Sequence, residues 1–204
     1  MIRLLLSSAF ADCVEQCCAV LLEGGVVTVP TDTVYGLICA ADAPAAARRI
    51  ARIKGRPDEK PFALFVASWE RLCREAITPS ETAERLARRY WPGGLTLVVG
   101  AEASCPSAQN GTVGARCPDT AFLQAVLARC GGVLINTSLN RSGEPPVCSL
   151  EECDAILAET DLVIDGEALP PSVASTVVHC GKIPYQILRE GAISAQAIAE
   201  ALGD

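Results

Sequence analysis

The chain has 204 residues, of which half are hydrophobic, a fifth are charged and only 4% are aromatic. That length suits a single domain over residues 1–204, and the apolar fraction excludes an intrinsically disordered chain. The net charge of −7 argues against a protein that coats nucleic acid, so any phosphate site must be a local group of Lys and Arg side chains.

Apolar runs rich in Val, Leu and Ile alternate with Ala-rich amphipathic stretches, which indicates an α/β domain with helices outside a twisted, mixed sheet. The first apolar run is short for a signal peptide, and we expect a strand or loop there. Helices are predicted at residues 13–22, 43–53, 80–90, 119–128, 149–158 and 194–202. Strands are predicted at residues 25–29, 34–39, 62–66, 95–99, 111–116, 133–135, 162–164, 175–178 and 187–188.

Several of these helices have a predicted N-terminal cap. Ser80 and Asp119 precede apolar periodic stretches and can accept hydrogen bonds from the first turn. Ser149 followed by Glu152 has the spacing of a capping box.

Eleven cysteines are scattered along the chain without a Cys-x-x-Cys pair. Because His179 is the single histidine, no Cys/His set has zinc spacing, and we predict no protein metal site. We expect small buried thiols in a reducing cytoplasm, with a disulfide framework as the less favoured alternative. No apolar run is long enough to span a membrane.

Hydroxyl-bearing residues follow the first buried strand, in the segment 31–37. Hydroxyls at a strand end either serve a turn or hold a small polar ligand at the sheet edge, and the pattern favours neither. Lys54 and Arg56 end the second helix, with Lys60 nearby. Cations at a helix C-terminus complement the helix dipole. They suit a phosphate equally well, because Arg can donate two N–H bonds to phosphate oxygens and Lys adds a compact positive charge.

Three further polar groups lie near strand ends. Alternation along the strand at 111–116 places Arg116 on one face with Thr112, where it could bind a carboxylate or form a surface ion pair. Ser138 and Asn140 are separated by one residue in a turn-rich segment. Their polar side chains can orient the rest of a ligand whose phosphates bind the Lys and Arg side chains. Arg189 could face the same cleft or pair with its neighbour Glu190.

The motifs of several enzyme classes are absent. The sequence has no phosphate-binding Gly-x-x-x-x-Gly-Lys-Ser/Thr loop, no Gly-x-Gly-x-x-Gly fingerprint and no Gly-x-Ser-x-Gly elbow. A single histidine also disfavours a Ser-His or Cys-His nucleophile. An enzyme of this kind would position reactants and stabilise charge rather than form a covalent intermediate.

Short polar segments in a fixed order cover nearly the whole chain, and together they resemble the YrdC family of threonylcarbamoyl-AMP synthases. The matching segments are residues 30–37, 54–57, 91–98, 113–116, 137–143, 175–178 and 187–193. The resemblance implies a YrdC-like fold with a concave, positively charged cleft. Because the chain ends soon after the last segment, we expect a short form without the extra C-terminal domain of longer relatives.

The resemblance also implies a reaction. L-Threonine, bicarbonate and ATP would give threonylcarbamoyl-AMP and pyrophosphate, for the threonylcarbamoyladenosine modification of tRNA next to the anticodon. Magnesium would arrive with the ATP as a substrate ion, and no tightly bound cofactor is expected. Expected partners are the other proteins of that tRNA pathway, with weak RNA binding, and the expected location is the cytoplasm.

Site residues carried over from the resemblance fall into three groups. The catalytic group is Lys54, Arg56, Ser138 and Asn140. The ATP contacts are Arg56, Lys60, Thr112, Asn140, Cys148 and Arg189. The threonine contacts are Thr33, Arg116, Ser138 and Ser175, with Arg116 facing the carboxylate.

The sequence departs from the family pattern at several positions. Leu139 stands where the family usually has alanine, which predicts extra bulk near the ligand. Phe65 lies where many relatives have a threonine-contacting histidine, and His179 replaces a frequent acidic residue. Cys148 falls near a position that often holds a hydroxyl.

Two other functions are considered. A non-catalytic module that binds double-stranded RNA, or a translation-associated module, could use the same concave face, although the net charge weighs against it. A carbamoyl-transfer domain of the hydrogenase-maturation type is disfavoured because zinc-finger and acylphosphatase-like segments are absent.

Overall fold

The computed structural model describes residues 2–55, 61–151, 153–169 and 173–203, and it confirms the α/β class. Within these ranges, one large mixed sheet carries flanking helices. The strands are β1 (Ile2–Leu5), β2 (Val27–Val29), β3 (Gly36–Ala40), β4 (Ala63–Val66), β5 (Ile77–Thr78), β6 (Leu95–Ala101), β7 (Thr112–Arg116), β8 (Val133–Ser138), β9 (Leu162–Asp165), β10 (Thr176–His179) and β11 (Gln186–Arg189). The helices are α1 (Phe10–Leu22), α2 (Pro44–Ile53), α3 (Trp69–Leu72), α4 (Glu81–Tyr90), α5 (Ala121–Arg129), α6 (Asp154–Leu157) and α7 (Ala195–Leu202).

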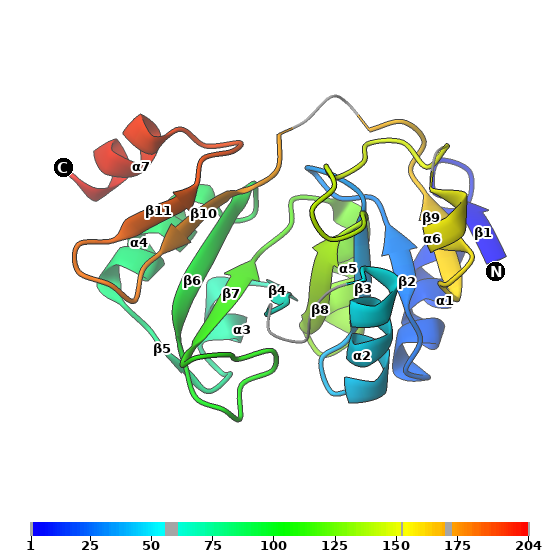
Figure 1. Ribbon diagram of the computed structural model, residues 1–204, viewed down its shortest axis with the longest axis horizontal. Helices are drawn as coiled ribbons and strands as arrows, with labels where there is room; N and C mark the ends of the chain where they lie inside the picture. The colour runs from blue at the N-terminus through cyan, green and yellow to red at the C-terminus, as the bar shows by residue number, and fades with distance from the viewer. Residues whose placement is uncertain (1, 56–60, 152, 170–172, 204) are drawn as a thin grey trace.

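The sheet has the strand order β1-β9-β2-β3-β8-β4-β7-β6-β10-β11, with β5 paired to β6. Strand β8 runs antiparallel to both neighbours, whereas β4 pairs with β7, and β6 with β10, in parallel. Figure 1 shows the sheet twisting from β1 at one end to β10 and β11 at the other. This order inserts β8, which follows β7 in the chain, between two strands from the first third.

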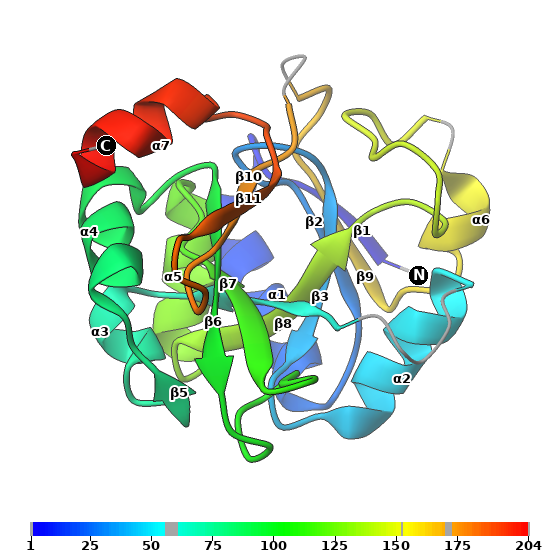
Figure 2. The ribbon, with the colours of Figure 1, turned by 60° about the vertical axis from the view of Figure 1, so that its left-hand side comes forward.

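Strands β3, β4 and β8 each bury their two faces in different cores. In β8, Val133 and Ile135 belong to the core that also contains residues of α2, α3, α4, α6 and α7. Leu134 belongs to the core on the opposite face, with residues of α1 and α5. Helices α4 and α7 lie side by side at the end of the sheet that carries β10 and β11 (Figures 1 and 2). Because α1 and α5 cover only part of their face, the remainder of that face is left for the pocket described below.

The predicted N-terminal cap is right for α4 and one residue too early for α5. The Ser80 hydroxyl accepts a hydrogen bond from the Ala83 N–H, which confirms the predicted cap. Asp119 was the wrong choice for α5, because Thr120 is the cap and accepts from the Leu123 N–H at 3.1 Å. The cap lies one residue later than predicted, so the hydroxyl of Thr120 occupies the capping position.

The predicted capping box before α6 is also wrong. The helix begins at Asp154 and its N-cap residue, Cys153, makes no side-chain capping bond. Ser149 instead accepts a hydrogen bond from the Glu151 N–H, and Glu152 lies outside the described residues. The helix spans only four residues rather than the ten predicted.

Strand β8 is longer than its apolar run predicts. It continues through Asn136 and Thr137 to Ser138, which pairs with Gly36 of β3. Asn136 pairs with both β3 and β4, whereas Thr137 and Ser138 pair with β3 alone. These ladder hydrogen bonds override the turn preference of the polar residues. Ser138 therefore lies at a strand end and not in a turn.

All eleven cysteines are described, all are free thiols, and Cys73 is the one exposed residue among them. Burial raises the pKa of the Cys39 and Cys180 thiols to about 12. Such thiols stay protonated near neutral pH and act as small core residues. The expectation of buried, unpaired cysteines is confirmed for most of them.

Candidate active site

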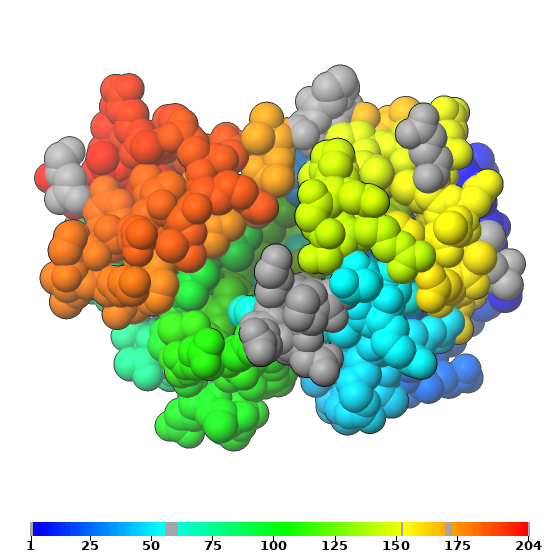
Figure 3. Space-filling model, viewed as in Figure 1, coloured from blue at the N-terminus to red at the C-terminus, as the bar shows by residue number. Residues whose placement is uncertain are grey.

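A pocket of about 480 Å³ opens on the part of the sheet face that α1 and α5 leave uncovered. Side chains on one face of the sheet form the floor of the pocket, among them Phe65 of β4, Thr96 of β6 and Asn136 of β8. Residues of the segments 31–36 and 138–146 form one wall, and the strand β10 region forms the other. Figure 3 shows the hollow between these walls, and its volume is in the range of small-molecule sites.

Arg116 is buried at the end of β7 and held by three protein groups. Its Nε donates to the Gly93 carbonyl at 2.9 Å, and one terminal nitrogen donates to Thr33 Oγ1 at 2.7 Å. The other lies 2.5 Å from the Asp32 carboxylate, with side chains only 7% and 15% exposed. The predicted face is confirmed, but the surface ion pair is wrong because this pair is buried. A guanidinium has five N–H donors, so at least two remain for a ligand carboxylate.

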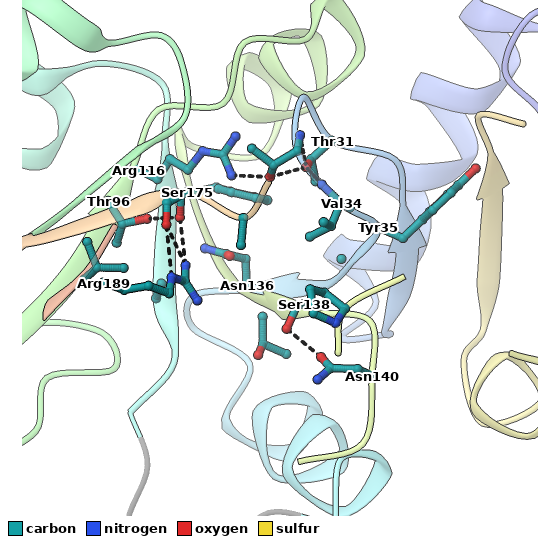
Figure 4. A pocket seen from close by; sticks show the side chains of 18 of the residues that line it. Thr31, Val34, Tyr35, Thr96, Arg116, Asn136, Ser138, Asn140, Ser175 and Arg189 are labelled. Carbon is teal, nitrogen blue, oxygen red and sulfur yellow. Dashed lines mark hydrogen bonds between the residues drawn. The ribbon is translucent and has the colours of Figure 1, made fainter. Parts of the chain in front are cut away.

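Ser175 and Arg189 form the facing wall (Figure 4). The Ser175 hydroxyl lies 2.8 Å from Thr96 Oγ1, and Arg189 donates through Nε and one terminal nitrogen to the Ser175 carbonyl. Burial and the positive charge of Arg116 lower the pKa of Arg189. The two guanidinium groups therefore repel one another, and an anion bound between them would relieve that repulsion.

Asn140 organises the wall that follows β8. Its Oδ1 accepts from Ser138 Oγ at 2.6 Å and from Lys54 Nζ at 2.9 Å. Its Nδ2 donates to the carbonyls of Arg141 and Glu144. All four hydrogen-bonding positions of the amide are thus used within the protein. Ser138 donates its only proton to Asn140 and keeps lone pairs that can accept from a ligand.

Lys54 supports the same wall from behind. Its Nζ donates to the carbonyls of Ser138 and Asn140 at 2.5 and 2.8 Å, in addition to the Asn140 side chain. The side chain is only 5% exposed and does not line the pocket. The geometry therefore gives Lys54 a positioning role, and direct contact with phosphate stays a prediction.

Leu139 does not add bulk beside the ligand, which corrects the prediction made from the sequence. It is fully buried in the core that also contains residues of α2, its N–H donates to the Tyr35 carbonyl, and it does not line the pocket. Alternation after Ser138 turns the larger side chain away from the cavity.

Leu139→Ala is accordingly expected to lower the free energy of unfolding by about 2–5 kcal/mol, through a cavity in the core. Ligand affinity should stay unchanged, because the pocket surface is not altered. Denaturant unfolding and titration calorimetry would measure the two quantities. Altered affinity at unchanged stability would contradict the buried position.

The remaining predicted residues are not gathered at the pocket. Thr112 lies at the opposite end of β7 from Arg116, about 13 Å along the strand, and its hydroxyl donates to the Gln109 carbonyl. Cys148 lies beyond the lining, and its carbonyl accepts from the Leu169 N–H. ATP contacts by these two residues stay predictions. The predicted sites at Arg56 and Lys60 fall outside the described residues, and the positive cleft that depends on them stays a prediction.

Three polar residues of the site were missed. Asp32 pairs with Arg116, Thr96 contacts Ser175, and Asn136 lies in the pocket floor. Thr96 interrupts an apolar strand and Asn136 directly follows an apolar run, which are the signals that could have marked them. The sequence contains no comparable signal for Asp32, because its partner is 84 positions away.

Comparison with known proteins shows a family relationship. A family model described as Telomere recombination, Sua5/YciO/YrdC, matches residues 19–191. The chain belongs to the Sua5/YciO/YrdC family. Thus the segments that form the pocket walls and floor lie within the matched region.

Relatives in this family carry informative names. Threonylcarbamoyl-AMP synthase of Pyrococcus abyssi is 33% identical over 186 residues, which cover 89% of this chain and 55% of that protein. The protein of the same name from Thiobacillus denitrificans is 35% identical over 81% of this chain and 90% of its own length. The crystal structure of P. abyssi Sua5 complexed with L-threonine is 31% identical, with a TM-score of 0.84 over 93% of this chain and 57% of that chain. The chain therefore spans little more than half of some relatives and most of others.

Proposed function

We propose that this chain is an L-threonylcarbamoyladenylate synthase, a nucleotidyltransferase that uses L-threonine, bicarbonate and ATP. The observation that carries the proposal is the pocket itself. At one end a buried Arg116 keeps N–H donors for a carboxylate. At the other end the Ser138 hydroxyl, which donates to Asn140, keeps lone pairs that can accept from a ligand. Relatives named threonylcarbamoyl-AMP synthase, and a relative's structure with L-threonine, support the assignment.

In this proposal Arg116 binds the threonine carboxylate with the N–H donors that its protein partners leave over. Thr33 and Asp32 hold the guanidinium in place, so little side-chain freedom is lost on binding. Ser175, held by Thr96, can contact the polar groups of the amino acid. These residues orient the amine toward the centre of the pocket.

The chemistry takes place in two steps. The threonine amine and bicarbonate first give a carbamate and water. A carbamate oxygen then bonds to the α-phosphorus of ATP, while the bond from that phosphorus to pyrophosphate breaks and its electron pair leaves with pyrophosphate. Arg189, which lines the pocket, would stabilise the growing negative charge, and we expect Arg56 and Lys60 to contribute further charge. Magnesium would neutralise phosphate oxygens and enter with ATP.

The product would supply the threonylcarbamoyl group for adenosine next to the anticodon of tRNA. The partners that follow from this are the other proteins of that modification pathway, with weak RNA binding, in the cytoplasm. Among the described helices, none has the combination of length and apolar character needed to cross a bilayer.

Mass spectrometry of a reaction with all three substrates is the direct test. We expect threonylcarbamoyl-adenylate and pyrophosphate to form together, and to disappear when threonine, bicarbonate or ATP is omitted. Salt-sensitive RNA binding without ATP turnover would refute the synthase and support the RNA-binding alternative.

A further inference from the structure

Asn136 is a pocket residue whose side chain has an unmet hydrogen bond. It lies in the pocket floor, yet its Nδ2 is buried and has no hydrogen-bond partner among the described residues. Asn140, four residues on, has all its bonds satisfied within the protein. Because an unpaired buried donor is costly, such a group in a pocket indicates a ligand that completes it.

The sheet register places Asn136 between the two ends of the pocket. Across β4 and β7 it is level with Ala63 and Gly114. Arg116 belongs to the next row in one direction, and Ser138 to the next row in the other. Each row is two residues, or about 7 Å, from the next. Asn136 thus lies midway between the carboxylate end and the Ser138 end (Figure 4).

The row of Asn136 leaves room above the sheet. Its neighbours, Ala63 and Gly114, are the smallest residues a strand can carry. Even a Cβ added at Gly114 would meet Thr96 and Ala63 only at ordinary contact distances of 3.7 and 3.8 Å. A small planar group can therefore approach the amide in this row, beside the open face of the pocket.

We propose that Asn136 binds the carbamate formed from threonine, by donating an N–H to the oxygen that does not attack phosphorus. This inference rests on the proposed function. The other oxygen bonds to the α-phosphorus as pyrophosphate leaves, and the oxygen held by Asn136 becomes the carbonyl oxygen of the mixed anhydride. The amide gains and loses no proton, so it orients the carbamate without protonating its nucleophilic oxygen. Donation to the carbamate costs Nδ2 no hydrogen bond to the described protein residues, because it makes none with them.

Asn136→Ala and Asn136→Asp test this assignment by steady-state release of pyrophosphate and calorimetric binding of L-threonine. We expect kcat to fall about 100-fold in the alanine variant, as for loss of one transition-state donor, and further in the aspartate variant, because its carboxylate repels the carbamate. Threonine affinity should change less than about threefold, since Arg116 holds the amino acid. The Tm of the free protein should not fall, because the amide nitrogen has no partner in it.

Thr28→Val is the matched control. Thr28 Oγ1 is also buried without a partner among the described residues, but it lies in β2 and does not line the pocket. This variant should keep the wild-type kcat. If the wild type is active and Asn136→Ala is equally active, the inference is overturned while the proposed function stands. The same holds if the loss of kcat is accompanied by a fall in Tm large enough to explain it. A wild type that makes no adenylate would overturn the proposed function, and this inference with it.

Discussion

Arg116→Ala is expected to abolish adenylate formation and to lower the Tm by roughly 10 °C. Removing one partner of a buried ion pair leaves the Asp32 carboxylate uncompensated, at a cost of about 3–5 kcal/mol. The same change removes the donors proposed to bind the threonine carboxylate. Thermal unfolding and pyrophosphate release measure the two effects separately.

Two further variants separate stability from function at Arg116. Replacing both partners, as Arg116→Met with Asp32→Asn, should restore most of the stability and none of the activity. Arg88→Ala removes an exposed pair with Glu84 and should cost less than about 1 kcal/mol. If Arg116→Ala melts like the wild type, the buried pair contributes little. If it keeps full activity, Arg116 does not bind the substrate carboxylate.

Lys54→Met is expected to weaken ATP binding at least about tenfold and to lower the free energy of unfolding by about 3 kcal/mol, because it removes the donor to buried oxygens. Those oxygens are the Ser138 and Asn140 carbonyls and the Asn140 side chain. The wall after β8 should loosen, and threonine affinity should fall less than ATP affinity, because Arg116 at the other end of the pocket is not altered. Titration calorimetry with each ligand, and hydrogen exchange at the Ser142 N–H that donates to the Lys54 carbonyl, would show this.

Lys182→Met is the control for loss of a lysine charge. Lys182 is exposed and bonds only the Gln186 side chain among its described partners. It should leave stability and both affinities unchanged. An equal loss of threonine and ATP binding in Lys54→Met would contradict a role confined to the wall after β8.

Most elements of the fold could be predicted because they depend on neighbours in sequence. Apolar periodicity predicted α1, α2, α4 and α7, and the Ser80 cap was recognisable from residue type and spacing alone. The short elements α3 and β5 were missed, since a run of two to four residues carries little periodic signal. Strand β8 was predicted too short, because pairing with β3 and β4 extends it through polar residues.

The candidate site divides in the same way. Thr33, Arg116, Ser138, Ser175 and Arg189 were named from motifs, and all line one pocket. Their chemistry follows from residue type, since a guanidinium suits carboxylate or phosphate in any fold. The sequence by itself therefore determined the α/β class, the family and most of the polar groups of the site.

Only the tertiary structure decided how these groups are used. It paired Asp32 with Arg116, directed Lys54 to the wall after β8, buried Leu139 and left the Asn136 amide nitrogen without a partner among the described residues. These outcomes depend on the strand order, which brings β8 between β3 and β4. Contacts between residues 80 or more positions apart are set by the packing of the whole sheet, and no local pattern of residue types encodes them.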